Sequence, residues 1–309
     1  MRGLTTFGEV RQRVEQLSAN CHDELVPVSD LYFDNLDTVL IGGEAHHMRP
    51  VAQRALAYRL GIPVNYLGRC PHELQSLQLN HWMSQERNDR LFIRFDGLEV
   101  RAIFTPRYKP VDNLTVLERL ISMGVNEETK VQVSLDAEFM ALSLPDDDRT
   151  FTVMGDRITP GVSVSNSEVG LASLTISAFF LRLVCTNGLV AKTMVASSFR
   201  HVSEKVLENF QLVVGDVAGQ LDQGRDRIRI SMEARVDDPS STIKSLGRQF
   251  LLGKEEQEAA EWGYAYEPGH TMFHVVNAFT RGAQYPQLNA EASHRLQRVG
   301  GEVLAIMVR

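Results

Sequence analysis

The 309-residue sequence lacks an apolar run long enough to cross a membrane. Its longest strongly apolar run, residues 178–184, contains Arg182 and is far shorter than the ~20 residues that a membrane helix requires. Residues 1–11 carry no apolar stretch of the kind found in export signals. The three cysteines form no CxxC motif, and the chain is too large to need a disulfide framework. We therefore expect a cytoplasmic protein that does not bind a membrane.

Motifs for metal ions and phosphate groups are also missing. His46 and His47 follow Glu44, but adjacent side chains point apart on regular structure and do not give the spacing of zinc ligands. Gly42-Gly43 lacks the lysine and the glycine spacing of a phosphate-binding loop. We expect neither a metal ion nor another cofactor. Because the formal net charge is -7, binding to nucleic acid would need a localised basic surface.

Helical periodicity dominates both ends of the sequence. Apolar residues at spacings of three and four predict helices over 7–17, 50–60, 71–87 and 111–123. Thr5 or Thr6 is placed to cap the first of these helices. From Ser203 onward the same periodicity predicts further helices, including 242–252, 254–264, 271–281 and 291–307.

Strand patterns fill the middle third. Alternating apolar residues on both sides of Asp96-Gly97 predict a hairpin of 91–96 and 100–104. Further strands are predicted over 131–144, 150–154, 161–169 and 174–184. We expect an α+β protein with a central antiparallel β-sheet and flanking helices. It would comprise a mainly helical region 1–88, a sheet core 89–202 and a helical region 203–309, packed as one interlocked unit without long linkers.

Three polar residues interrupt the apolar strands of the middle third. Asn166 and Glu168 lie on the same predicted strand face as Val164, because strand side chains repeat every second residue. Arg182 is the single charge in the next strand, so it is the expected ion-pair partner of Glu168. Two interpretations stay open: a buried pair that fixes strand register, or part of a functional site.

Asn187 and His201 extend this polar group beyond the strands. Together with Cys185 they supply the residue types of a cysteine nucleophile with its imidazole and orienting amide. Their spacing gives that interpretation no support, and a cysteine at the end of an apolar strand is more often a small buried residue.

The predicted hairpin is the second candidate surface. Arginines alternate there with aromatic rings, a combination by which sheets and grooves hold single-stranded nucleic acid. The candidate nucleic-acid-binding residues are Arg94, Arg101, Arg107, Tyr108 and Lys109. Acidic residues in the same segment offset most of this charge, so an ordinary amphipathic hairpin is the alternative.

Residues 161–188 read GVSVSNSEVG followed by LASLTISAFFLRLVCTNG, and this stretch resembles the phage/plasmid-like family catalogued as a domain of unknown function, DUF932. The stretches FIRFDGLEVRAIFTPRYKPVDN (92–113) and HVVNAFTRGAQ (274–284) support the resemblance. It implies a DNA-handling context, because members occur on phages, prophages and conjugative plasmids, and it implies no catalytic residues. The matching positions are Asn166, Ser167, Glu168, Arg182, Cys185, Asn187, Gly188, His201, Asn277 and Thr280.

Three hypotheses about function follow. The first is a non-enzymatic protein of DNA replication or recombination that binds single-stranded DNA through the hairpin as a homo-oligomer. The second is an enzyme with a polar pocket at Asn166, Glu168, Arg182 and Asn187, in which Cys185 or His201 takes part. The third is a host-modulating interaction protein.

Overall fold

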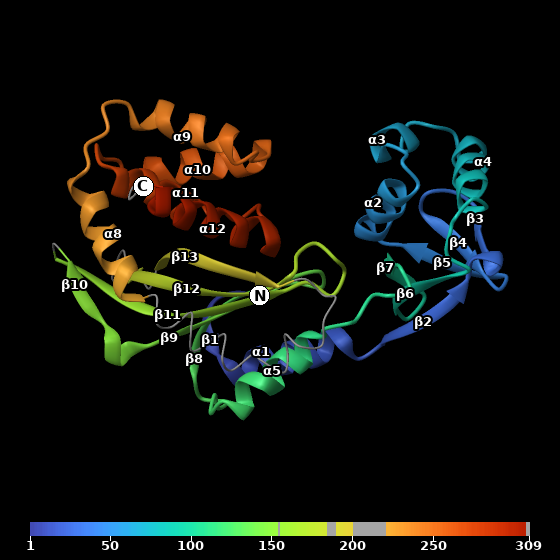
Figure 1. Cartoon of the computed structure of the whole chain (residues 1–309), viewed down its shortest axis with the longest axis horizontal. Coiled ribbons are helices and arrows are strands. Elements are labelled where there is room, and N and C mark those ends of the chain that lie inside the picture. The colour runs from blue at the N-terminus through green and yellow to red at the C-terminus, as the bar shows by residue number, and fades with distance from the viewer. Residues whose placement is uncertain (154, 184–189, 200–220, 307–309) are drawn as a thin grey trace.

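The protein is an α+β structure with two sheets (Figure 1). The computed structural model describes residues 1–153, 155–183, 190–199 and 221–306. The large sheet contains, in order, β1 (Arg2–Thr6), β8 (Lys130–Leu135), β9 (Met140–Pro145), β11 (Asp156–Asn166), β12 (Leu174–Leu183) and β13 (Val190–Phe199). The short strand β10 (Phe151–Val153) pairs with β11 at one end of this sheet. All of these pairs are antiparallel.

The small sheet forms a separate lobe with its own helices. Its order is β2 (Cys21–Pro27), β6 (Arg90–Asp96), β7 (Glu99–Phe104), β5 (Glu44–Met48), β4 (Thr38–Ile41) and β3 (Leu31–Phe33). The β5–β7 pair is parallel and the other pairs are antiparallel. Helices α2 (Pro50–Arg59), α3 (Val64–Leu67) and α4 (His72–Met83) complete the lobe, and a short 3-10 turn spans Val28–Asp30.

Helices cover both faces of the large sheet (Figure 1). On one side lie α1 (Phe7–Ser18) and α5 (Asn113–Ser122). On the other side lie α9 (Pro239–Gln249), α10 (Lys254–Tyr266), α11 (Met272–Gly282) and α12 (Ala290–Ile306), reached through α8 (Leu221–Glu233). A short 3-10 turn spans Asp147–Arg149 before β10. The C-terminal helices therefore pack across the sheet, as the helical periodicity predicts.

Local sequence explains where the first helix starts. The Thr6 hydroxyl accepts a hydrogen bond from the backbone N–H of Glu9, and the Glu9 carboxylate accepts one from the Thr6 N–H. This capping box satisfies donors that the first helical turn leaves unpaired. Phe7, Val10 and Val14 then share one face and are buried, which attaches α1 to the core.

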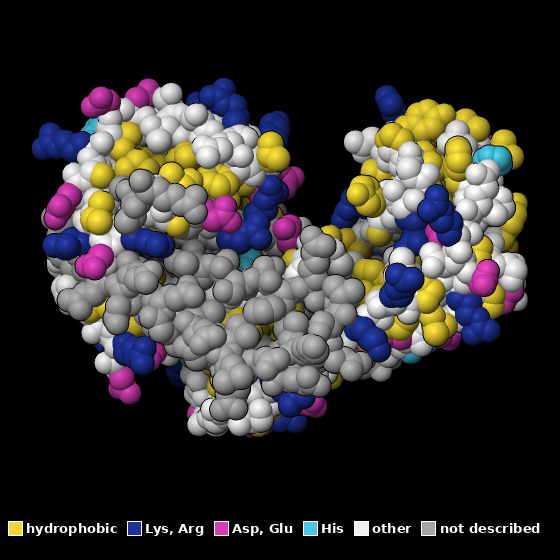
Figure 2. Space-filling model, in the orientation of Figure 1, with side chains coloured by type: hydrophobic (Ala, Val, Ile, Leu, Met, Phe, Trp, Pro, Cys, Tyr) yellow, Lys and Arg dark blue, Asp and Glu magenta, His cyan; other side chains and the backbone are white. Residues whose placement is uncertain are grey.

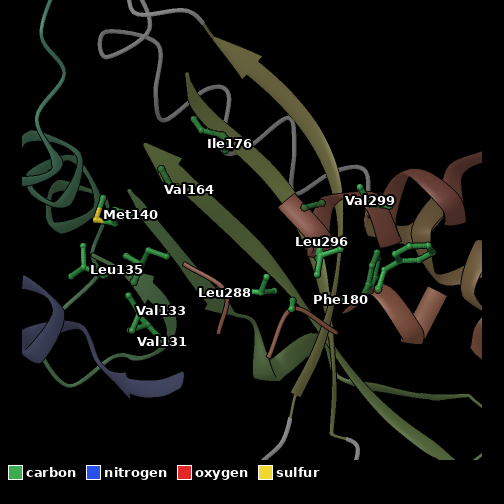
Figure 3. Packing of buried hydrophobic residues seen from close by; sticks show 14 of the residues in the cluster. Val131, Val133, Leu135, Met140, Val164, Ile176, Phe180, Leu288, Leu296 and Val299 are labelled. Atoms are coloured by element: carbon green, nitrogen blue, oxygen red, sulfur yellow. The ribbon is translucent and has the colours of Figure 1, made fainter. Parts of the chain in front are cut away.

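One large apolar core joins the strands to helices from both faces. Figure 3 shows Val164, Ile176 and Phe180 from the strands together with Leu296 and Val299 of α12. A smaller core lies inside the small lobe and packs α2, α3 and α4 against its sheet. Each sheet thus has its own apolar core, and the contacts between the lobes lie outside both.

The hairpin prediction is confirmed locally, but its assignment to the central sheet is wrong. Strands β6 and β7 pair as expected around Gly97, which adopts a φ of 57°. Their neighbours in the sheet, however, are β2 and β5, which come from the region expected to be mainly helical. Alternating polarity shows that a segment is a strand; it does not specify which strand lies beside it.

The single strand expected over 131–144 is two strands. The chain turns at 136–139 between β8 and β9, and the Asp136 carboxylate accepts hydrogen bonds from the backbone N–H groups of Glu138 and Phe139. An aspartate side chain often stabilises a turn through such local hydrogen bonds. Apolar residues continue on both sides of this turn, so the sequence pattern predicts one uninterrupted strand.

The close crossing of α10 and α11 gives a stability test. A Cβ atom added at Gly263 would lie 2.2 Å from the Ala278 carbonyl oxygen, whereas one at Gly247 of α9 meets nothing closer than 3.5 Å. We expect Gly263→Ala to lower the free energy of unfolding by about 1–3 kcal/mol through overpacking. Gly247→Ala should raise it by up to about 1 kcal/mol through helix propensity. Urea denaturation of both variants measures the difference, and equal effects would contradict the described helix crossing.

Candidate functional site

Glu168 lies where the two lobes meet, just beyond the end of β11. Its side chain is 6% exposed. Its Oε2 accepts a hydrogen bond from Arg101 Nη2 at 2.8 Å, and its Oε1 accepts one from the backbone N–H of Asn113 at 2.7 Å. Its backbone carbonyl accepts a hydrogen bond from Arg94 Nη1 at 3.2 Å. One residue therefore connects the large sheet, the hairpin β6–β7 and the first residue of α5.

A β-bulge places Arg101 in this position. Arg94 pairs with Ala102 and Phe95 pairs with Val100, so Arg101 is an extra residue in β7. Bulges redirect side chains, and here the guanidinium reaches both Glu168 and the Cys21 Sγ, which lies 3.0 Å from Nη1. The hairpin periodicity gives no sign of this bulge.

Arg94 is held by carboxylates from two other segments. Its Nε and Nη2 donate to Asp23 at 2.8 and 3.1 Å, and Nη2 also donates to Asp112 at 2.5 Å. Burial lowers the pKa of Arg94, but these hydrogen bonds and charges outweigh burial and raise it. Arg94 is therefore a permanently charged, buried structural cation.

Asn166 completes the group. Its Nδ2 donates to the Val111 carbonyl at 2.8 Å and to the Asn113 Oδ1 at 3.0 Å. We refer to Arg94, Arg101, Asn113, Asn166 and Glu168 as the junction cluster. Both residues hold the start of α5 against the large sheet, but they do not share a strand face as expected, because β11 ends at Asn166 and Glu168 lies in the turn beyond it. Their partners are groups of the protein itself, whereas the Asn166 Oδ1 and the Arg101 Nε have no hydrogen-bond partner among the described residues.

The expected Glu168–Arg182 ion pair is wrong. Arg182 lies opposite Ile158, whereas Thr175 lies opposite Ser165 near the end of β11 that leads to Glu168. At about 3.3 Å per residue, Arg182 is roughly 20 Å along the strand from that end. Its guanidinium instead binds Asp156 at 2.9 Å and both carboxylate oxygens of Glu267 at 2.8 and 2.9 Å.

The predicted polar pocket is consequently not assembled as one site. Glu168 and Arg182 belong to two different ion-pair networks at opposite ends of β12. Arg182 also stacks over the Phe273 ring and lines a cavity of about 20 Å³ with Asn277. Asn187, His201 and Cys185 lie outside the described residues, so the cysteine-nucleophile interpretation stays a hypothesis.

The other predicted nucleic-acid-binding residues occupy the loop after β7. Tyr108 stacks on Phe104 with ring centres 3.8 Å apart, and burial raises the pKa of its hydroxyl to about 12. Arg107 and Lys109 on either side of it are exposed. Only these two of the five candidates present a charge to solvent, because Arg94 and Arg101 are enclosed in the junction cluster.

A different basic and aromatic surface lies on α2, and the sequence analysis missed it. Val51 of α2 packs between the lobes against Ala102 and Val169. Arg54 and Tyr58 follow at helical spacing on the same side of α2. Arg54 is exposed, and Tyr58 is 90% exposed. Composition could have indicated this surface, since residues 45–72 contain four arginines and no Asp or Glu.

This face of α2 borders the hollow between the lobes. Figure 2 shows the molecule as two masses with a notch between them, and Lys and Arg side chains lie on both sides of the notch. Across it, Glu138 in the β8–β9 turn interacts electrostatically with Arg54. Burial and the nearby Asp136 carboxylate raise the pKa of Glu138, and Arg54 acts in the opposite direction. We call Arg54 and Tyr58 the α2 face.

Two further classes of site were searched for over the described ranges. No group of three or more His, Cys, Asp or Glu side chains there is arranged to hold a metal ion. No helix within those ranges has both the length and the apolar character of a membrane span.

Comparison with known proteins gives one match. Residues 101–283 match the model of the family described as "Domain of unknown function (DUF932)". The chain belongs to this family. No curated protein and no solved structure matches it. In this DUF932 protein the match runs from Arg101 of the bulge to the end of α11, so it includes Glu168 and Arg182 and leaves out the α2 face.

The junction cluster makes a quantitative prediction for this DUF932 protein. Arg101→Ala would leave the Glu168 carboxylate buried without its cation, which typically costs about 3–5 kcal/mol. Arg11→Ala breaks exposed pairs with Glu15 and Glu127 and should cost less than about 1 kcal/mol. Denaturation of the two variants under one set of conditions compares the losses. A loss for Arg101→Ala as small as that for Arg11→Ala would show that the cluster does not hold the lobes together.

Proposed function

We propose that the protein binds single-stranded nucleic acid along the α2 face and acts in DNA replication or recombination. The observation that carries this proposal is the pairing of Tyr58, 90% exposed, with the exposed guanidinium of Arg54 one helical turn away. A single exposed aromatic ring is common on a protein surface, so it is the arginine beside Tyr58 that gives this ring the composition of a stacking site. A base stacked on Tyr58 and a phosphate beside Arg54 would use both groups.

The chemistry suits a single strand. Every base has a π-face, so stacking on an exposed ring is tolerant of sequence, while a nearby arginine follows the backbone. The overall charge of -7 repels nucleic acid, so binding needs a local basic surface. Within 45–72, Arg49 and Arg59 are paired with carboxylates, and Arg54 and Arg69 are the exposed arginines that can supply it. Arg107 and Lys109 remain proposed contacts for phosphate, as exposed side chains of the loop after β7.

The replication or recombination context rests on the family resemblance. DUF932 members occur on phages, prophages and conjugative plasmids, whose DNA-handling genes create and process single strands. The hydrogen bonds that join the lobes occupy polar groups of the junction cluster. Groups used in this way are not free to act on a substrate, and this supports a non-enzymatic role.

Binding of a fluorescent oligothymidine, followed by anisotropy at low salt, tests the proposal. Tyr58→Ala should weaken binding by about 1–3 kcal/mol, and Tyr58→Phe should not, because the ring carries the stacking energy. Arg54→Ala should reduce the slope of log K against log salt concentration by about 0.7.

Arg13→Ala is the matched control, because Arg13 is an exposed helical arginine on α1, away from the α2 face. It should leave both the affinity and the salt slope unchanged. The proposal fails if the wild-type protein binds no single strand at low salt, or if Tyr58→Ala binds as tightly as the wild type.

We also propose that the protein is a homo-oligomer that associates through the outer side of α4. Residues 74–85 contain no charged residue, and Leu74 and Leu77 of this helix are exposed, Leu77 by 67%. A two-fold interface sets one surface against its own copy, so a charge close to the symmetry axis would meet its like. The exposed leucines give this side of α4 an apolar centre of the kind that self-association favours, with Glu73 and Asp34 beside Leu77 at its edge.

Sedimentation velocity distinguishes the oligomer from the monomer. Leu77→Glu would place a charge at this interface and should convert the oligomer to monomer. Leu98→Glu changes an apolar residue of similar exposure in the hairpin turn and should leave the oligomer intact. A monomeric wild type, or an unchanged Leu77→Glu variant, would rule out this interface.

A further inference from the structure

Arg281, in the last turn of α11, is a buried charge without an opposing charge in the described part of the chain. The residue is only 2% exposed to solvent. Nη1 donates to the Gln284 Oε1 at 3.1 Å, and the guanidinium carbon lies 3.7 Å from the centre of the Tyr266 ring and 5.7 Å from that of Trp262. Its buried Nε has no hydrogen-bond partner among the described residues.

Arg281 differs from the other enclosed arginines in having no carboxylate partner within the described ranges. The buried Arg94 and Arg101 and the partly buried Arg182 each bind at least one carboxylate, although the Nε atoms of Arg101 and Arg182 also have no hydrogen-bond partner there. Glu267, the acidic residue that follows Tyr266 in sequence, already accepts hydrogen bonds from Arg182 with both of its carboxylate oxygens. A buried guanidinium normally has a charged or fully hydrogen-bonded partner, because removing it from water is costly.

The groups around Arg281 compensate its charge only in part. The rings of Tyr266 and Trp262 give cation–π interactions, and the end of α11 presents the negative end of the helix dipole. None of these supplies an acceptor for Nε, which lies on the Nε–Nη2 edge of the guanidinium. That edge carries two parallel N–H groups, which match the two oxygens of a phosphate or a carboxylate.

We infer that the Nε–Nη2 edge of Arg281 binds the oxyanion of a ligand, and that Tyr266 and Trp262 line the same site. Tyr266 is about half exposed, so its outer ring face is open to a planar group of the ligand. The phosphate of a nucleotide, with its base against Tyr266, satisfies both features. The site lies in the C-terminal helices, on the lobe opposite the α2 face, and does not depend on the proposed function of that face.

Intrinsic fluorescence gives a direct test. The protein has two tryptophans, so Trp82→Phe leaves Trp262 as the only reporter, next to Arg281. Titration with a nucleoside monophosphate should give a saturable change in its emission, with a weaker response to inorganic phosphate. Acetate tests whether a carboxylate alone suffices. The melting temperature should also rise with ligand concentration.

Arg281→Lys keeps the charge but removes the two-pronged edge, so binding should weaken by roughly ten- to hundredfold. Arg248→Lys, at an exposed arginine of α9, and Arg54→Ala on the other lobe should bind like the parent. Equal affinity in Arg281→Lys overturns the inference. The inference is also overturned if the parent protein shows neither a fluorescence change nor a rise in melting temperature. This second test does not depend on whether the Arg281 variant folds.

Discussion

The Glu168 carboxylate is the group on which the relative placement of the two lobes depends. Its two oxygens bind the Arg101 guanidinium of the small lobe and the backbone N–H that begins α5. A carboxylate at a helix N-terminus interacts favourably with the helix dipole, and a charge-assisted pair in a buried site holds a defined geometry. Because each sheet has its own apolar core, the described contacts that join the lobes are this carboxylate, further hydrogen bonds from Arg94 and Arg101, and a small apolar patch around Val51 and Val169.

The junction also creates the notch. Val51 packs between the lobes, and Arg54 and Tyr58 follow it at helical spacing on the same side of α2, with Arg54 near enough to Glu138 of the large lobe to interact with its charge. The position of a basic and aromatic surface is therefore a consequence of how the lobes are fixed. A weakened Glu168–Arg101 pair would alter the notch without touching the α2 face itself.

Three buried arginines and the partly buried Arg182 show two uses of the same side chain. Arg94, Arg101 and Arg182 bind carboxylates from other segments and thereby tie distant parts of the chain together. Arg281 binds ring faces and one amide oxygen and has no carboxylate partner among the described residues. A carboxylate partner gives the first three an architectural use, and its lack at Arg281 is the reason we infer a ligand there.

The sequence by itself determined the elements: the Thr6 cap, the hairpin around Gly97, the C-terminal helices and the α+β class all follow from local spacing. It also identified Asn166 and Glu168 as unusual, because polar residues in apolar strands need partners. Only the tertiary structure decided which partners they have. Strand register separates Arg182 from Glu168, and a bulge brings in Arg101 instead. Pairing between segments far apart in sequence depends on register and packing, and these leave no periodic signal in the chain.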